Sequence, residues 1–207
     1  MKYFVLKNPK AEEYENVTDY VTIEESVLGK APVCPVCGSY TGMLPVLPPV
    51  VVEIQSQGSQ WSDVSFGSGD QILVSDQLKK RFVDYSLLGI ESIEPVAIAK
   101  AQSRKRMMPN PPKYWICTIT HSKISIDDKA SNLVRERSWT CPYCKFGGLI
   151  ESFDRVILED EDQTSEDIFF ARGLPGTLLV SAKFKRVCDE IGLPECYFVE
   201  SSKYSIR

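Results

Sequence analysis

Two short cysteine motifs, CPVCG and CPYCK, place the strongest constraint on how this chain of 207 residues can fold. The first contains Cys34 and Cys37, and the second contains Cys141 and Cys144. A CxxC turn directs two thiolates to one side of a tight loop, and two facing turns complete a tetrahedral set of four sulfur ligands for Zn²⁺. The sequence therefore predicts a structural zinc site that joins two distant segments of the chain.

Other interpretations of the cysteine motifs stay open. CPYC is also the redox motif of glutaredoxins, in which the first cysteine opens a helix that lowers its pKa. Residues 145–148, KFGG, are a poor helix start, and a redox role would leave the other motif unexplained. A pair of turns that has lost its metal is a second alternative. A catalytic zinc is a third, but it would normally need an open fourth position.

Short sequence anchors recur in the same order along the chain, which favours an ancient internal duplication. The alternative is convergent use of the same strand and helix-cap residues. The anchors are KYFV from Lys2 and KYWI from Lys113, the two CPxC motifs, the LVS segments that end at Ser75 and Ser181, and Gly89 and Gly192.

The repeated plan predicts an α+β fold of two related β-rich halves, each with a CPxC zinc knuckle and one amphipathic helix packed on strands. Ser75 and Ser181 have the side chain of a helix N-cap, and apolar residues follow them at helical spacing. The glycines of the last anchor stand where each helix would stop. We expect strands over 2–6, 50–54, 90–96, 113–119, 149–158 and 196–199, and a loop over 58–70.

The predicted halves are residues 1–96 and 112–207, which together form one compact unit. A basic and proline-rich linker over 97–111 joins them. This linker could contact nucleic acid, but a solvated linker is favoured because no aromatic residue interrupts its charges.

Composition and missing motifs narrow the class of function. A formal net charge of −4 argues against a general nucleic-acid binder, whose affinity comes mostly from cations that neutralise phosphates. No apolar stretch has the length of a membrane helix, and the N-terminal apolar run is too short for a signal peptide, so we expect a soluble, cytoplasmic protein. The chain has no recognisable catalytic motif, and its single histidine, His121, has no ligand spacing to other residues. We predict that it is not an enzyme.

Two sequence features are candidates for partner binding. Trp61 stands in a polar segment, where an exposed aromatic side chain would anchor a partner; local packing is the alternative. An acidic loop would attract a basic partner, unless it is only a solvated loop. Its carboxylates are Glu159, Asp160, Glu161, Asp162, Glu166 and Asp167.

With CPVCG, CPYCK, the opening MKYFVLKN and the late LLVSAKFKRVCDEIGL, the chain resembles the double-CXXCG motif proteins. This family includes immunity proteins that protect bacteria from contact-delivered toxins. The resemblance implies a cytosolic protein that binds and neutralises a cognate toxin and has no catalytic residues. The chain departs from the family pattern at Lys145, which stands in place of a glycine. The alternative functions are a zinc-knuckle adaptor for nucleic acid or transcription, and a CPYC thiol oxidoreductase.

Overall fold

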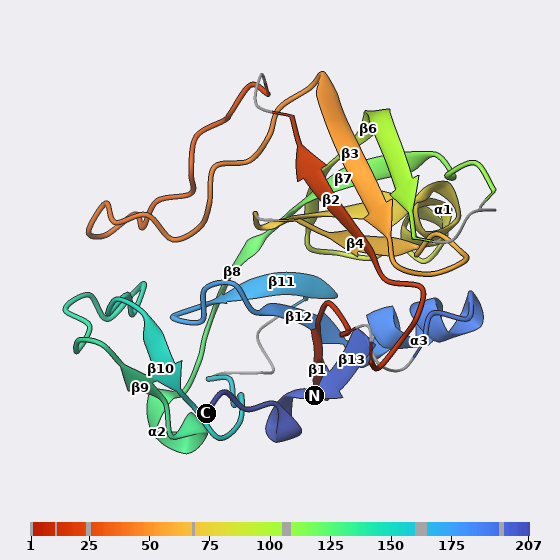
Figure 1. The fold of residues 1–207 in the computed structure, drawn as a ribbon. Helices are drawn as coiled ribbons and strands as arrows, with labels where there is room; N and C mark the ends of the chain where they lie inside the picture. Colours follow the sequence, from red (N-terminus) through yellow and green to blue (C-terminus); the bar gives the residue numbers. More distant parts are fainter. Residues whose placement is uncertain are drawn as a thin grey trace.

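The computed structural model describes residues 2–10, 12–23, 26–67, 69–104, 109–159, 165–194 and 197–207. Within these residues the chain is mixed α+β and rich in strands, with short helices, which agrees with the predicted fold class. A barrel and an open sheet lie one above the other, and two loop regions extend from them to the same side (Figure 1).

The barrel closes in the strand order β2-β3-β6-β7-β5-β4. Alternate residues of β3, namely Val50, Val52 and Ile54, are buried, as expected for a strand with one face in a core. They pack with Leu73 and Ile116 inside the barrel. The barrel strands are β2 (Thr18–Thr22), β3 (Val50–Ser56), β4 (Val64–Phe66), β5 (Gln71–Ser75), β6 (Ile90–Ser103) and β7 (Tyr114–Ile119).

The open sheet has the order β13-β1-β12-β11-β8. Its neighbours pair antiparallel, except that β8 and β11 pair parallel. The strands are β1 (Tyr3–Leu6), β8 (His121–Ser125), β11 (Ile168–Arg172), β12 (Leu178–Ser181) and β13 (Phe198–Glu200).

The first strand of each predicted half pairs with the other half. β1 pairs with β12, with Tyr3 opposite Ser181, and β7 pairs with β5, with Tyr114 opposite Ser75. The order β13-β1-β12-β11 in the sheet therefore corresponds to β6-β7-β5-β4 in the barrel. The two predicted halves consequently contribute to each other's sheets.

Each of the two longer helices begins at the predicted serine. α1 (Asp76–Asp84) has Ser75 as its N-cap, and α3 (Ala182–Glu190) has Ser181. Each serine Oγ accepts a hydrogen bond from the backbone N–H three residues later. Each Oγ also donates to an aspartate carboxylate: Asp63 in the first case and Asp167 in the second.

A shared hydrophobic core lies between the barrel, the open sheet and the two helices. It includes Leu78 and Phe82 of α1 and Phe184 and Val187 of α3. The rings of Phe82 and Phe184 have centroids 5.3 Å apart, so the two helices meet at this contact. Burial of these apolar faces is the main source of stability for such short helices.

Two loop regions carry the cysteine motifs, and we call them the first cysteine arm (residues 26–49) and the second cysteine arm (residues 133–152). The first connects β2 to β3, and the second is a hairpin built on the paired strands β9 and β10 (Figure 1). The remaining elements are α2 (Asp128–Ser131), β9 (Val134–Arg135), β10 (Ile150–Ser152) and the 3₁₀ helix η3 (Ser201–Lys203).

The largest differences between the observed and the predicted elements concern β6, β4 and β10. β6 continues to Ser103 because it pairs with β3 along the whole of that strand, so the first part of the expected linker is strand. The expected loop over 58–70 contains β4, whose three residues pair with β5. The strand expected over 149–158 is only β10, and isolated bridges at Phe153 and Leu158 follow it.

Candidate metal centre

The four predicted ligands come together where the two cysteine arms meet. The Sγ atoms of Cys34, Cys37, Cys141 and Cys144 all lie within 4.8 Å of one another. The Sγ atoms of Cys34 and Cys141 are 3.9 Å apart, and those of Cys37 and Cys144 are 3.6 Å apart. Thiolates bound tetrahedrally at about 2.3 Å from Zn²⁺ lie roughly 3.8 Å from one another. The four cysteines can therefore hold one metal ion between the arms.

The two CPxC segments form turns with the same backbone pattern. The N–H of Gly38 donates to the carbonyl of Cys34 at 2.9 Å, and the N–H of Lys145 donates to that of Cys141 at 3.0 Å. Both donor residues have a positive φ, 73° for Gly38 and 51° for Lys145. The left-handed conformation brings the chain round after the second cysteine, which explains the glycine of the first motif.

Lys145 stands in the second turn where the first turn has a glycine, and its side chain links this turn to neighbouring segments. It is buried, and its Nζ donates to the Ile126 carbonyl at 2.9 Å and to Glu159 Oε1 at 2.6 Å. Burial raises the pKa of Glu159, but hydrogen bonds from Lys145 and Ser125 outweigh it, so this pKa lies below its ordinary value. Lys145 therefore has a φ that is unfavourable for a residue with a side chain, and its hydrogen bonds connect the turn to the end of β8.

A second cation supports the same turn. Arg172 at the end of β11 places its guanidinium 4.3 Å from the ring centroid of Tyr143, and its Nη1 donates to the Tyr143 carbonyl at 2.8 Å. Tyr143 lies between the two cysteines of the second motif. A metal ion with four thiolates carries net negative charge, and cations and hydrogen bonds around such a site stabilise it.

The thiols differ in their proton affinity. Hydrogen bonds with Ser39 lower the pKa of the exposed Cys37 thiol to about 6, whereas burial raises the pKa of Cys144 to about 12. A bound metal ion would displace the protons of all four thiols, so its affinity depends on pH. Cys117 and Cys188 are buried in the shared core, apart from the metal centre, and Cys196 lies outside the described residues.

Of the residues predicted for partner binding, those that the structure describes are buried or only partly exposed. Trp61 packs against the barrel core, and its Nε1 donates to the Pro109 carbonyl at 2.8 Å, which is the local-packing alternative. Asp167 is buried against the N-cap of α3 and pairs with Lys183 at 3.1 Å. Glu159 pairs with Lys145, and Glu166 is half-buried. Residues 160–162, which complete the predicted acidic loop (Asp160, Glu161 and Asp162), lie outside the described residues.

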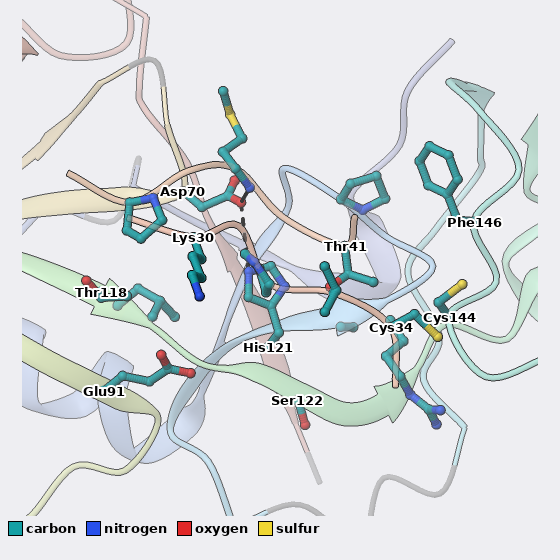
Figure 2. A pocket seen from close by; sticks show the side chains of 18 of the residues that line it. Lys30, Cys34, Thr41, Asp70, Glu91, Thr118, His121, Ser122, Cys144 and Phe146 are labelled. Atoms are coloured by element: carbon teal, nitrogen blue, oxygen red, sulfur yellow. Dashed lines mark hydrogen bonds and ion pairs between the residues drawn. The ribbon is translucent and has the colours of Figure 1, made fainter. Parts of the chain in front are cut away.

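Sequence reasoning missed a cavity beside the metal centre. It has a volume of about 410 Å³ and lies between both cysteine arms, the barrel and the open sheet. Figure 2 shows His121 in the middle of the lining, with Cys34 and Cys144 to one side and Glu91 to the other. The Nε2 of His121 is 3.8 Å from Asp70 Oδ2, and burial lowers the pKa of this histidine. Only the topology brings these residues together, because no spacing in the sequence relates them.

The chain matches no profile of a known protein family, and a search of curated proteins also gives no match. The resemblance to the double-CXXCG motif proteins therefore stays a prediction. Among the described residues, no helix combines the length and the apolar character needed to cross a membrane.

Proposed function

We propose that this chain is a non-enzymatic binding protein, stapled by one structural zinc ion, that acts as an immunity protein against a cognate bacterial toxin. The observation that carries the zinc part is the convergence of four cysteine thiols from two distant arms. A site with four thiolates suits Zn²⁺, and it leaves no open position for substrate or water. The metal would then serve the fold rather than chemistry.

Internal duplication is part of the proposal, because it explains why one metal site takes two ligands from each predicted half of the chain. It is supported by the corresponding strand orders and by the matching registers at Ser75 and Ser181. It is also supported by the equivalent turns at Cys34 and Cys141. In this account each half supplies one knuckle, and zinc binding adds directly to the free energy of folding.

The immunity role is supported by the sequence resemblance and by the kind of scaffold that such a role needs. An inhibitor that acts by occlusion needs a rigid framework and an accessible surface, and it needs no catalytic group. The two cysteine arms extend from a well-packed body, which is compatible with this requirement (Figure 1).

Two alternative functions have less support. In a CPYC oxidoreductase the first cysteine is accessible at a helix start, whereas Cys141 is buried and opens a turn. In a nucleic-acid adaptor the basic segment over 97–111 would be free, whereas its residues up to Ser103 belong to β6, where Lys100 lies 4.0 Å from Glu53.

Co-expression tests the immunity proposal. The protein encoded immediately upstream is expressed in a sensitive host with this chain, without it, and with an unrelated soluble protein as the control. We expect toxicity that only this chain relieves. An absence of toxicity, or toxicity that persists beside folded protein, contradicts the immunity role.

Single cysteine substitutions test the shared site. Cys34→Ser and Cys141→Ser should lower zinc content and thermal stability to a similar extent, because each removes one ligand of the same ion. Cys117→Ser is the matched control, since this thiol is buried away from the cluster. Unchanged zinc content and stability in Cys34→Ser would disprove a shared ion.

A further inference from the structure

Exposed large apolar side chains gather on the two cysteine arms. Tyr40 is 71% exposed and Leu149 is 76% exposed, although both are large hydrophobic residues. Few exposed residues of this kind lie elsewhere in the described part of the chain. Those on the arms are Val27, Leu28, Val33, Val36, Tyr40, Met43, Leu44 and Leu47 in the first, and Val134, Trp139, Phe146 and Leu149 in the second. Apolar residues grouped in this way mark interaction sites in soluble proteins.

Two hollows border the first cysteine arm, so this surface is not flat. One is the cavity of about 410 Å³ between the arms that Figure 2 shows. The other has a volume of about 570 Å³ and is lined mainly by apolar groups, among them Tyr20, Leu28, Tyr40 and Val46. Pockets of this size accept side chains of a partner, and anchors that fill such pockets supply most of the binding energy in protein complexes.

The low charge of the first cysteine arm indicates which class of partner can bind this surface. Between residues 26 and 49 the only charged side chain is Lys30. Nucleic acids and anionic membrane surfaces are bound by clusters of Lys and Arg, which this arm lacks. Depletion of charge at the centre of an apolar patch is instead typical of protein–protein interfaces.

Prolines in the same arm disfavour strand pairing with a second copy of the chain. Five of them lack the N–H group that strand pairing between two copies would need. They are Pro32, Pro35, Pro45, Pro48 and Pro49. Contact with this arm must therefore come from side chains that fit a complementary surface.

We propose that the two cysteine arms together form the docking face for a protein partner of different sequence, whose apolar side chains enter the two hollows. This inference rests on the proposed function, in which that partner is the toxin. Because the metal ion joins the arms, it holds both parts of the face in one arrangement. Partner binding and metal binding then favour each other, as linkage requires.

The test compares exposed apolar residues on and off the arms. Tyr40→Asp and Leu149→Asp place a charge in the docking face, and Val83→Asp on α1 is the matched control because Val83 is 62% exposed. Zinc content and melting temperature are measured for each variant, so that a folding defect is not taken for a binding defect. Calorimetry then gives the affinity of each for the toxin used in the co-expression test.

We expect both arm substitutions to weaken toxin binding at least about tenfold with the fold retained, and Val83→Asp to change it less than about twofold. Toxin binding that survives both arm substitutions overturns this inference alone. So does light scattering that shows a dimer which either arm substitution dissociates, because the face would then serve a second copy. Failure of the wild-type chain to bind the toxin overturns the immunity proposal as well.

Discussion

At the scale of single residues, the glycines that follow α1 and α3 are required for different structural reasons. Gly89 and Gly192 each follow a helix and have positive φ, 101° and 78°. A Cβ on Gly89 would clash with the carbonyl oxygen of Ile168, whereas a Cβ on Gly192 would meet nothing within 4 Å. The first glycine therefore permits close approach of two backbones, and the second only permits a turn.

Alanine substitutions at these two positions should therefore lower the free energy of unfolding by different amounts. We expect Gly192→Ala to lower the free energy of unfolding by about 1 kcal/mol, the cost of a left-handed residue with a side chain. Gly89→Ala should cost about 3 kcal/mol or more, because the backbone of β11 must also move. Chemical denaturation of both variants measures the difference, and equal losses would contradict the contact at Ile168.

Lys145 provides a second prediction at this scale. Lys145→Met removes the partner of the Ile126 carbonyl and of Glu159, and it should lower the free energy of unfolding by about 1–3 kcal/mol. Glu159→Gln should cost less than about 1 kcal/mol, because the side chain of Glu159 is 44% exposed and water screens its charge. Denaturation of the two variants checks this order. A larger loss in Glu159→Gln would mean that the carboxylate, and not the lysine, anchors the turn.

At the scale of elements, local patterns in the sequence predict some features well. The serine caps of α1 and α3 and the strand over 50–54 are confirmed, because caps and buried strands depend on neighbouring residues. The three-residue strand β4 was missed, because it exists only through pairing with β5 and β2. The continuation of β6 to Ser103 depends in the same way on distant β3.

At the candidate metal centre, too, the sequence predicts some features and not those that depend on distant segments. The four ligands follow from the cysteine spacing, whereas the supporting contacts of Lys145 and Arg172 do not. Lys145 stands where the first motif has Gly38, and no sequence rule reveals that its side chain is buried. His121 and Asp70 approach each other because β5 pairs with β7 and Gln71 lies opposite Thr118, close to the start of β8.

Strand β1 gives a prediction at the scale of elements. It lies next to the N-terminus, where chains usually fray, but it pairs on both sides, with β12 and with β13. Its amides should therefore exchange hydrogen as slowly as those of β7, which has β5 and β6 as neighbours. Hydrogen exchange followed by mass spectrometry measures both strands. Exchange of β1 as fast as that of the cysteine arms would contradict its central place in the sheet.

At the scale of the whole molecule, the tips of the two cysteine arms meet at the four cysteine thiols. The barrel, the open sheet and the helices share a hydrophobic core that does not include the four cysteines. Metal removal by a chelator should therefore speed hydrogen exchange in residues 26–49 and 133–152 first. Exchange in the barrel strands should change much less, and uniform loss of protection would contradict this separation.

The central claim is that one metal ion is held by four thiolates from both arms, and cobalt substitution tests it most directly. The protein is purified, its zinc-to-protein ratio is measured, and the zinc is replaced by Co²⁺. The account predicts one ion per chain and the intense visible absorption of a tetrahedral site with four sulfur ligands. Cys34→Ser and Cys141→Ser should each shift that spectrum, while Cys188→Ser should leave it unchanged. A ratio near zero, or a spectrum unaffected by either arm substitution, would contradict the account.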